Sequence, residues 1–139
     1  MTHFDENSQT HLNLKKAFER ECQTSIRYIW FANKADIQGH PDMAARFRTL
    51  ADGASRQAQG HLEMLEQLGD PLSGKPVGDN VANVKASIAA VAQDETLMYP
   101  KFAQDAQQDG TQEVEQWFES CTRAKKNHGA ILARCLVNP

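Results

Sequence analysis

The sequence predicts an all-α protein, a four-helix bundle in which two helical hairpins are joined by a long crossover. Three observations predict this fold. Four long segments are rich in Ala, Gln, Glu, Lys and Leu, each carries an apolar stripe at three- to four-residue spacing, and the connections between them run short, long, short. A chain of 139 residues suits one domain with its own core.

Glycine and proline mark the ends of the predicted helices. Residues 39–41 and 109–111 are short breaks, whereas residues 69–78 form a long connection rich in both residue types. The polar residues 1–11 are predicted to be a flexible N-terminal tail, and residues 12–139 the bundle. The four predicted helices span about 12–38, 42–68, 80–108 and 112–136.

The two predicted hairpins repeat each other. Asn13 matches Asn83 at an offset of 70 residues, whereas Phe31 matches Phe102 at an offset of 71. One extra residue therefore enters the third helix between Asn83 and Phe102, close to Pro100. An inserted residue predicts a π-bulge, and the proline predicts a bend. The repeat also implies a pseudo-twofold axis through the bundle.

Composition and charge argue against several classes of function. A net charge of −3 leaves no basic surface for nucleic acid or anionic lipid. Charges interrupt the apolar stretches, so no membrane span is expected, and the polar N-terminus lacks the parts of a signal peptide. We therefore expect a cytoplasmic protein. The three cysteines form no C-x-x-C pair, which argues against a disulfide framework and against a zinc or rubredoxin module.

Polar side chains stand on or beside the apolar stripes of the predicted helices. Burying a charge without a partner is costly, so these side chains are expected to form a network at one level of the bundle. Lys125 and His128 have the i, i+3 spacing with which bundles present metal ligands, although a lysine takes the place of a carboxylate. The predicted network comprises Glu21, Gln57, Asp94, Lys125 and His128.

The sequence resembles the rubrerythrin family from about Asn13 to His128. The resemblance is carried by NLKKAFERECQTSIRYIWFANKADIQGHPDMAARFR in the first hairpin, GHLEMLEQLGDPLSGKPVG through the crossover and LMYPKFAQDAQQDG in the third helix. It implies a ferritin-like bundle, usually dimeric and sometimes with exchanged helices, whose carboxylate-bridged di-iron site reduces peroxide. Many members add a rubredoxin-type iron centre, for which this chain has no cysteine set.

Carried over residue by residue, the resemblance implies that most ligands of the di-iron site are absent. Glu21 and His128 match the family pattern, and Asp94 keeps a carboxylate where the family has glutamate. The second helix lacks a glutamate and a histidine, and the third and fourth helices each lack a glutamate. These four positions hold Ala54, Gln57, Val91 and Lys125.

The first functional hypothesis is a degenerate rubrerythrin-like protein without an intact di-iron site and without a cofactor. It would act as a scaffold, a partner subunit or a regulator. Lys125 would pair with Glu21 and Asp94 and so replace the charge of the metal. A polar network that only packs the bundle is the simpler reading of the same residues. We also expect a homodimer, an unidentified protein partner and a link to oxidative stress.

The second hypothesis is an oxidoreductase acting on peroxide. A single iron or another divalent metal could lie on Glu21, Asp94 and His128, or a metal-free site could use Lys125 with Tyr28 and Tyr99 as further catalytic candidates. Whether the chain is an enzyme is left open, because rubrerythrin-like peroxidase activity is expected to be lost or much altered. A di-iron site completed by another subunit ranks last.

Overall fold

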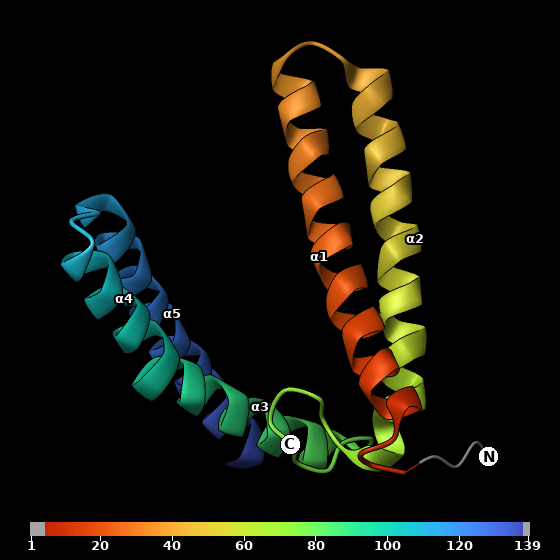
Figure 1. The fold of residues 1–139 in the computed structure, drawn as a ribbon, viewed down its shortest axis with the longest axis vertical. Helices are drawn as coiled ribbons and strands as arrows, with labels where there is room; N and C mark the ends of the chain where they lie inside the picture. Colours follow the sequence, from red (N-terminus) through yellow and green to blue (C-terminus); the bar gives the residue numbers. More distant parts are fainter. Residues whose placement is uncertain (1–4, 138–139) are drawn as a thin grey trace. The chain divides into compact units, whose positions relative to one another are not determined.

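The structure is a computed structural model that describes residues 5–137. Within this range the chain is helical, has no β-strand, and folds as two helical hairpins (Figure 1). The chain divides into two compact units, the first ending at Leu68 and the second beginning at Gly69. The predicted all-α fold with two hairpins and a long connection is confirmed.

Each compact unit contains one hairpin. The first consists of α1 (Gln9–Ile37) and α2 (Pro41–Leu65), which ends in the short 3-10 helix η1 (Glu66–Leu68). The third predicted helix is built from three consecutive pieces, and the fourth is continuous. The second hairpin comprises α3 (Asn80–Gln93), the π-helical segment η2 (Asp94–Met98), α4 (Tyr99–Gln108) and α5 (Gln112–Val137).

Side-chain caps set the starts of α1 and α3. The Ser8 hydroxyl accepts a hydrogen bond from the backbone N–H of His11 at 3.1 Å, so α1 begins at Gln9, three residues before the predicted boundary. Residues 9–11 of the predicted tail are therefore helical, and residues 1–4 lie outside the described part. The Asp79 carboxylate caps α3 in the same way, because its Oδ1 atom accepts a hydrogen bond from the backbone N–H of Ala82 at 2.8 Å.

The two hairpin turns have the same geometry. Gly39 and Gly110 adopt positive φ angles of 82° and 76°, which glycine tolerates best. After each glycine the next N–H returns to the helix: His40 donates to the Ala35 carbonyl at 2.8 Å, and Thr111 donates to the Ala106 carbonyl at 3.0 Å. The 71-residue repeat therefore extends to the backbone hydrogen bonds.

Three aromatic rings repeat with the same spacing in both hairpins. The ring centroids of Phe31 and Phe47 are 5.5 Å apart, and those of their counterparts Phe102 and Phe118 are also 5.5 Å apart. The tyrosine–phenylalanine pairs agree equally well: Tyr28 lies 6.0 Å from Phe47, and Tyr99 lies 6.0 Å from Phe118. The equal ring distances in the two hairpins confirm the predicted repeat.

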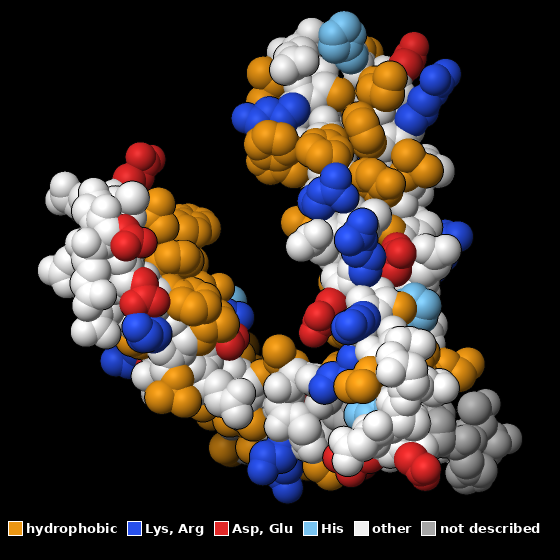
Figure 2. Space-filling model, viewed as in Figure 1, with side chains coloured by type: hydrophobic (Ala, Val, Ile, Leu, Met, Phe, Trp, Pro, Cys, Tyr) orange, Lys and Arg blue, Asp and Glu red, His pale blue; other side chains and the backbone are white. Residues whose placement is uncertain are grey.

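Small side chains fill the contact between the two helices of each hairpin. The small side chain of alanine lets helices approach closely. Between α1 and α2, the buried Ser25 hydroxyl donates a hydrogen bond to the Ala51 carbonyl oxygen at 3.0 Å. Most of the larger hydrophobic side chains are only partly covered, and Figure 2 shows them gathered at the surface of both hairpins. The buried hydrophobic residues are Ala32, Ala35, Ala44, Ala51, Ala54, Ala58, Leu65, Ala86, Ala90, Ala103 and Ala106.

Candidate functional site

The predicted insertion in the third helix is a π-helical turn. The η2 segment runs over Asp94–Met98, between regular α-helix on both sides. Pro100 follows in the first turn of α4 and has no N–H to donate, so the α-helical bonding pattern is already interrupted there. The predicted π-bulge is confirmed, and it lies at the helix level that carries Asp94.

An ion pair joins η2 to α5. The Lys125 Nζ atom lies 3.3 Å from Asp94 Oδ2, and the two side chains are 28% and 17% exposed. Solvent and salt screen a partly buried ion pair less than a pair that is fully exposed at the surface. The predicted contact between this lysine and this carboxylate is therefore present within the second hairpin, and its role stays a prediction.

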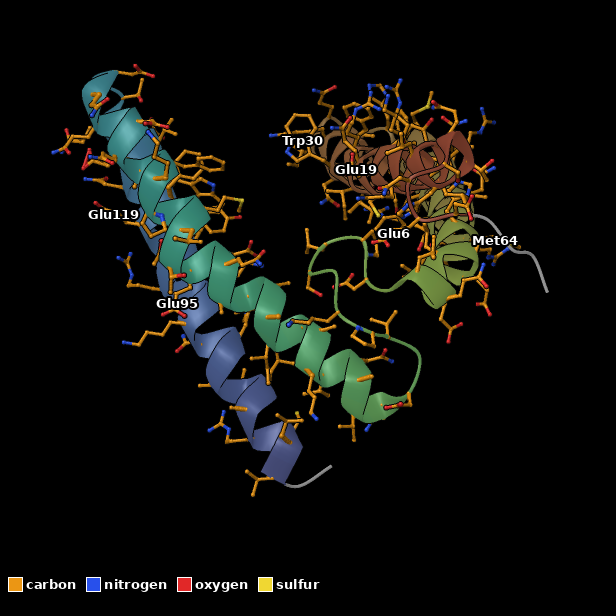
Figure 3. All side chains as sticks on the ribbon, turned by 60° about the horizontal axis from the view of Figure 1, so that its bottom comes forward. Glu6, Glu19, Trp30, Met64, Glu95 and Glu119 are labelled. Atoms are coloured by element: carbon orange, nitrogen blue, oxygen red, sulfur yellow. The ribbon has the colours of Figure 1, made fainter. Side chains whose placement is uncertain are left out.

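The other predicted network residues vary in burial. His128 is exposed on α5, one turn beyond Lys125. Glu95, which Figure 3 labels on the second hairpin, is half-buried on η2. In the first hairpin Glu21 on α1 is half-buried and Gln57 on α2 is exposed. These two residues belong to the other compact unit, and the structure describes them within that unit alone.

The tyrosines that we considered as catalytic candidates are half-buried aromatic packing residues in their own hairpins. Tyr28 packs against Phe47, and Tyr99 packs against Phe102 and Phe118 at centroid distances of 6.4 and 6.0 Å. Among residues 5–137, the structure records no hydrogen bond from either tyrosine hydroxyl. Their contacts are thus those of the aromatic clusters.

Apolar packing occupies two positions where the family resemblance implies ligands. Ala54 on α2 is 5% exposed and offers no donor atom. Val91 on α3 lies beside Gly129 on α5, where a Cβ atom would be 3.6 Å from Val91 Cγ1. Over residues 5–137, no group of three or more His, Cys, Asp or Glu side chains is arranged to hold a metal ion.

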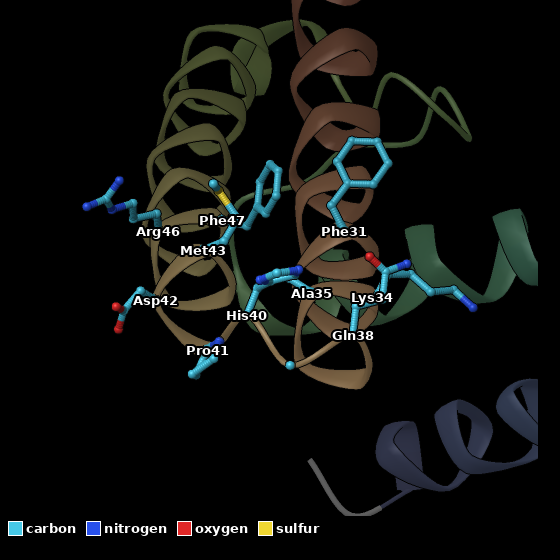
Figure 4. A pocket seen from close by; sticks show the side chains of 11 residues that line it. Phe31, Lys34, Ala35, Gln38, His40, Pro41, Asp42, Met43, Arg46 and Phe47 are labelled. Carbon is cyan, nitrogen blue, oxygen red and sulfur yellow. The ribbon is translucent and has the colours of Figure 1, made fainter.

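Sequence reasoning missed an open groove at the closed end of the first hairpin (Figure 4). Its lining includes the apolar residues Phe31, Ala35, Met43 and Phe47, and Lys34 is one of its polar lining residues. The corresponding positions of the second hairpin line a similar groove, which includes Phe102, Ala106, Val114 and Phe118. The repeat of aromatic and alanine positions was the signal that could have predicted both grooves.

The two helical hairpins, with a π turn inserted in the second of them, define the class as a ferritin-like all-α protein. The rubrerythrin family model matches residues 13–136. Within residues 5–137, no helix is both long and apolar enough to cross a membrane. The chain belongs to the rubrerythrin family.

Several curated rubrerythrins are similar to the chain over most of its length. The rubrerythrin of Nitratidesulfovibrio vulgaris is 32% identical over 126 residues, covering 87% of this chain and 65% of that protein. The rubrerythrins of Porphyromonas gingivalis and Clostridium perfringens are 26% and 27% identical, each over 87% of this chain. The chain spans 62% to 66% of the length of these three relatives.

Proposed function

We propose that this chain is a rubrerythrin-like protein without an intact di-iron site, in which a lysine–carboxylate pair takes the place of iron. The observation that carries the proposal is the ion pair between Lys125 and Asp94, which engages two of the positions that the family uses for ligands. Its role would be that of a scaffold, a partner subunit or a regulator linked to oxidative stress.

The donor set does not fit two irons. The family pattern supplies five carboxylates and two histidines, whose negative charge offsets that of the metals. At the same positions this chain has two carboxylates and one ammonium, a net charge of −1. Ala54 and Val91 offer no lone pair, and protonated Lys125 has none and repels a cation. We infer that the chain has no resident cofactor.

The alternative proposal is an oxidoreductase related to peroxide chemistry. It would use a single metal on Glu21, Asp94 and His128, or a metal-free site containing Lys125. Two of these potential ligands, Asp94 and His128, belong to the same hairpin, which favours this candidate. It ranks second because Asp94 already has the Lys125 ammonium 3.3 Å away, and that cation would have to leave before a metal could bind.

Metal content tests the proposal directly. The full chain is produced with ample iron, purified without chelator, and measured by inductively coupled plasma mass spectrometry. The proposal expects no stoichiometric metal. About one metal per chain, lost in His128→Ala, would instead support the mononuclear alternative, and two irons per chain would overturn both.

A gain-of-function variant supplies the matched positive control. Ala54→Glu, Gln57→His, Val91→Glu and Lys125→Glu together restore the ligand types of the family, and this variant should bind two irons per chain. Lys125→Met, which removes the ammonium without adding a ligand, should remain metal-free. Iron in Lys125→Met at the level of the restored variant would contradict the idea that the missing ligands prevent binding.

We further infer that the chain assembles as a homodimer in the cytoplasm, without nucleic acid. The support is its net charge of −3, the absence of a spanning helix over residues 5–137, and the hydrophobic side chains exposed on both hairpins.

A further inference from the structure

Asp94 lies where the hydrogen-bonding pattern of the third predicted helix changes. Its N–H donates to the carbonyls of Ala90 and Val91, four and three residues earlier, as at the end of a regular helix. Its own carbonyl accepts from the N–H of Tyr99, five residues later, which is the spacing of a π-helix. The carboxylate that pairs with Lys125 therefore belongs to the first residue of η2, and its direction depends on where the wide turn forms.

A threonine hydroxyl restrains the wide turn on the side of α3. Thr96 Oγ1 donates to the carbonyl oxygen of Ala92 at 2.6 Å, so a side chain inside η2 is tied to the last turn of α3. If the wide turn moved one residue toward α3, the N–H of Leu97 would have to bond to that same carbonyl, five residues earlier. Because the hydroxyl already uses this acceptor, the side-chain bond competes with the shifted backbone bond. The hydroxyl therefore opposes movement in this direction.

A proline prevents the corresponding movement toward α4. A shift of one residue in that direction would require the residue at position 100 to donate its N–H to the carbonyl of Glu95. That residue is Pro100, which has no N–H. The wide turn is therefore restrained on both sides, by a hydroxyl that occupies an acceptor and by a proline that lacks a donor.

We propose that Thr96 is a positioning residue, whose hydroxyl bond keeps the π turn in place and so holds Asp94 beside Lys125. This inference rests on the lysine–carboxylate pair proposed above and names a residue on which that pair depends. One residue turns an α-helix by about 100°, so a wide turn that moved past Asp94 would swing its carboxylate around the helix axis. The 3.3 Å separation between Lys125 Nζ and Asp94 Oδ2 would then be lost.

Other threonines of the chain form the same type of bond in regular helices. Thr122 Oγ1 donates to the Phe118 carbonyl oxygen at 3.2 Å within α5. Such bonds from a hydroxyl to the carbonyl four residues earlier affect helix geometry by themselves, so their general effect must be separated from the effect on the π turn. Thr122 provides this control, because it lies in the same hairpin and three residues before Lys125, in a helix without an inserted turn.

The test is a double-mutant cycle of Lys125→Met and Asp94→Asn, measured by urea denaturation of the full chain in four backgrounds. These are wild type, Thr96→Val, which keeps the branched shape without the hydroxyl, Thr96→Ser, which keeps the hydroxyl, and Thr122→Val. Thr96→Val should reduce the coupling between Lys125 and Asp94, expressed as a ratio of unfolding equilibrium constants, by at least about threefold. Thr96→Ser and Thr122→Val should leave the coupling as in wild type, whatever they do to overall stability. Circular dichroism checks that all variants remain helical.

The outcomes separate the role of Thr96 from the ion pair itself. Absence of coupling in wild type would overturn the pair that carries the proposed function, and the role of Thr96 with it. Coupling that survives in Thr96→Val would overturn the role of Thr96 alone. An equal loss in Thr96→Ser or in Thr122→Val would also overturn it, because the loss would then not come from this hydroxyl. Metal content tests the missing di-iron site independently of all these variants.

Discussion

The residue with the largest consequence for the chemistry is Lys125. Its side chain donates hydrogen bonds at a position where the family has a glutamate, whose carboxylate accepts them. Removing one partner of a buried pair costs about 3–5 kcal/mol, whereas exposed pairs contribute about 0.2–1 kcal/mol. With side-chain exposures of 28% and 17%, the Lys125–Asp94 pair lies between these limits. The contribution of the pair to the free energy of unfolding decides whether it is a structural ion pair or a surface contact without effect on stability.

We expect Lys125→Met to lower the free energy of unfolding by roughly 1–3 kcal/mol, because it leaves the Asp94 carboxylate partly buried and unpaired. Urea denaturation measures the change, and Lys126→Met, on the exposed neighbour, serves as the control. A double-mutant cycle with Asp94→Asn isolates the coupling energy. Additive effects of the two substitutions would mean that the pair contributes nothing to stability.

Cys22 is a second residue with a testable environment. Cys22 is exposed on α1, but partial desolvation raises the pKa of its thiol, and the nearby Glu19 carboxylate raises that pKa further. Because the thiolate is the nucleophile, Cys22 should alkylate more slowly than a small free thiol at pH 8, and the difference should disappear well above the folded-state pKa. Iodoacetamide kinetics in a Cys121→Ser, Cys135→Ser background measure this.

Glu19→Gln should speed the alkylation of Cys22 at pH 8 but leave the part of the delay that partial desolvation of the thiol causes. The same raised pKa affects stability. The protonated thiol is favoured in the folded state, so its contribution is complete below the unfolded pKa and is lost as the pH rises through the folded pKa. Alkylation at the rate of a free thiol across the whole pH range would contradict the raised pKa.

At the scale of single elements, η2 is the feature that the sequence could locate but not describe fully. The change of offset from 70 to 71 between Asn83 and Phe102 required an extra residue in that interval. The offset alone could not say where the wider turn would form, nor that Glu95 would be half-buried. One inserted residue rotates everything beyond it by about 100° unless a π turn absorbs it.

Deleting Thr96, an exposed residue of η2, should convert the π turn to α-helix and keep both ends in register. We expect the free energy of unfolding to change by less than about 1 kcal/mol. Deleting the exposed Gln104 in the regular helix α4 should cost more than about 3 kcal/mol, since it turns Ala106 out of the core. Thermal unfolding compares the two, and equal losses would mean that η2 does not absorb the extra residue.

Helix ends were the least accurate part of the prediction, and the reason is local. The start of α1 moved to Gln9 because the hydroxyl of Ser8 caps the helix, a signal weaker than the glycine at its other end. Gly39 and Gly110 fixed their turns correctly, since both need positive φ angles. Glycines that impose a backbone conformation were thus better indicators of helix ends than capping residues.

At the scale of the whole molecule, the all-α class and the two hairpins followed from composition, stripe spacing and breakers. The Lys125–Asp94 contact could also be anticipated, because both residues lie near one level of the repeat. Side-chain exposure could not be anticipated. Helical periodicity gives the face of a residue, but only coordinates give the neighbours that cover it, as the exposed His128 and Gln57 demonstrate.

The matching turns and aromatic clusters have a historical consequence. Two hairpins that share a φ-positive glycine and the same ring distances, at a fixed offset, are best explained by tandem duplication of one ancestral hairpin. After the duplication each copy could change separately. Ala54 against Lys125 and Gln57 against His128 record that divergence, at equivalent positions of the two copies. At the first of these pairs of positions, the second hairpin carries the charged Lys125, whereas the first hairpin carries the apolar Ala54.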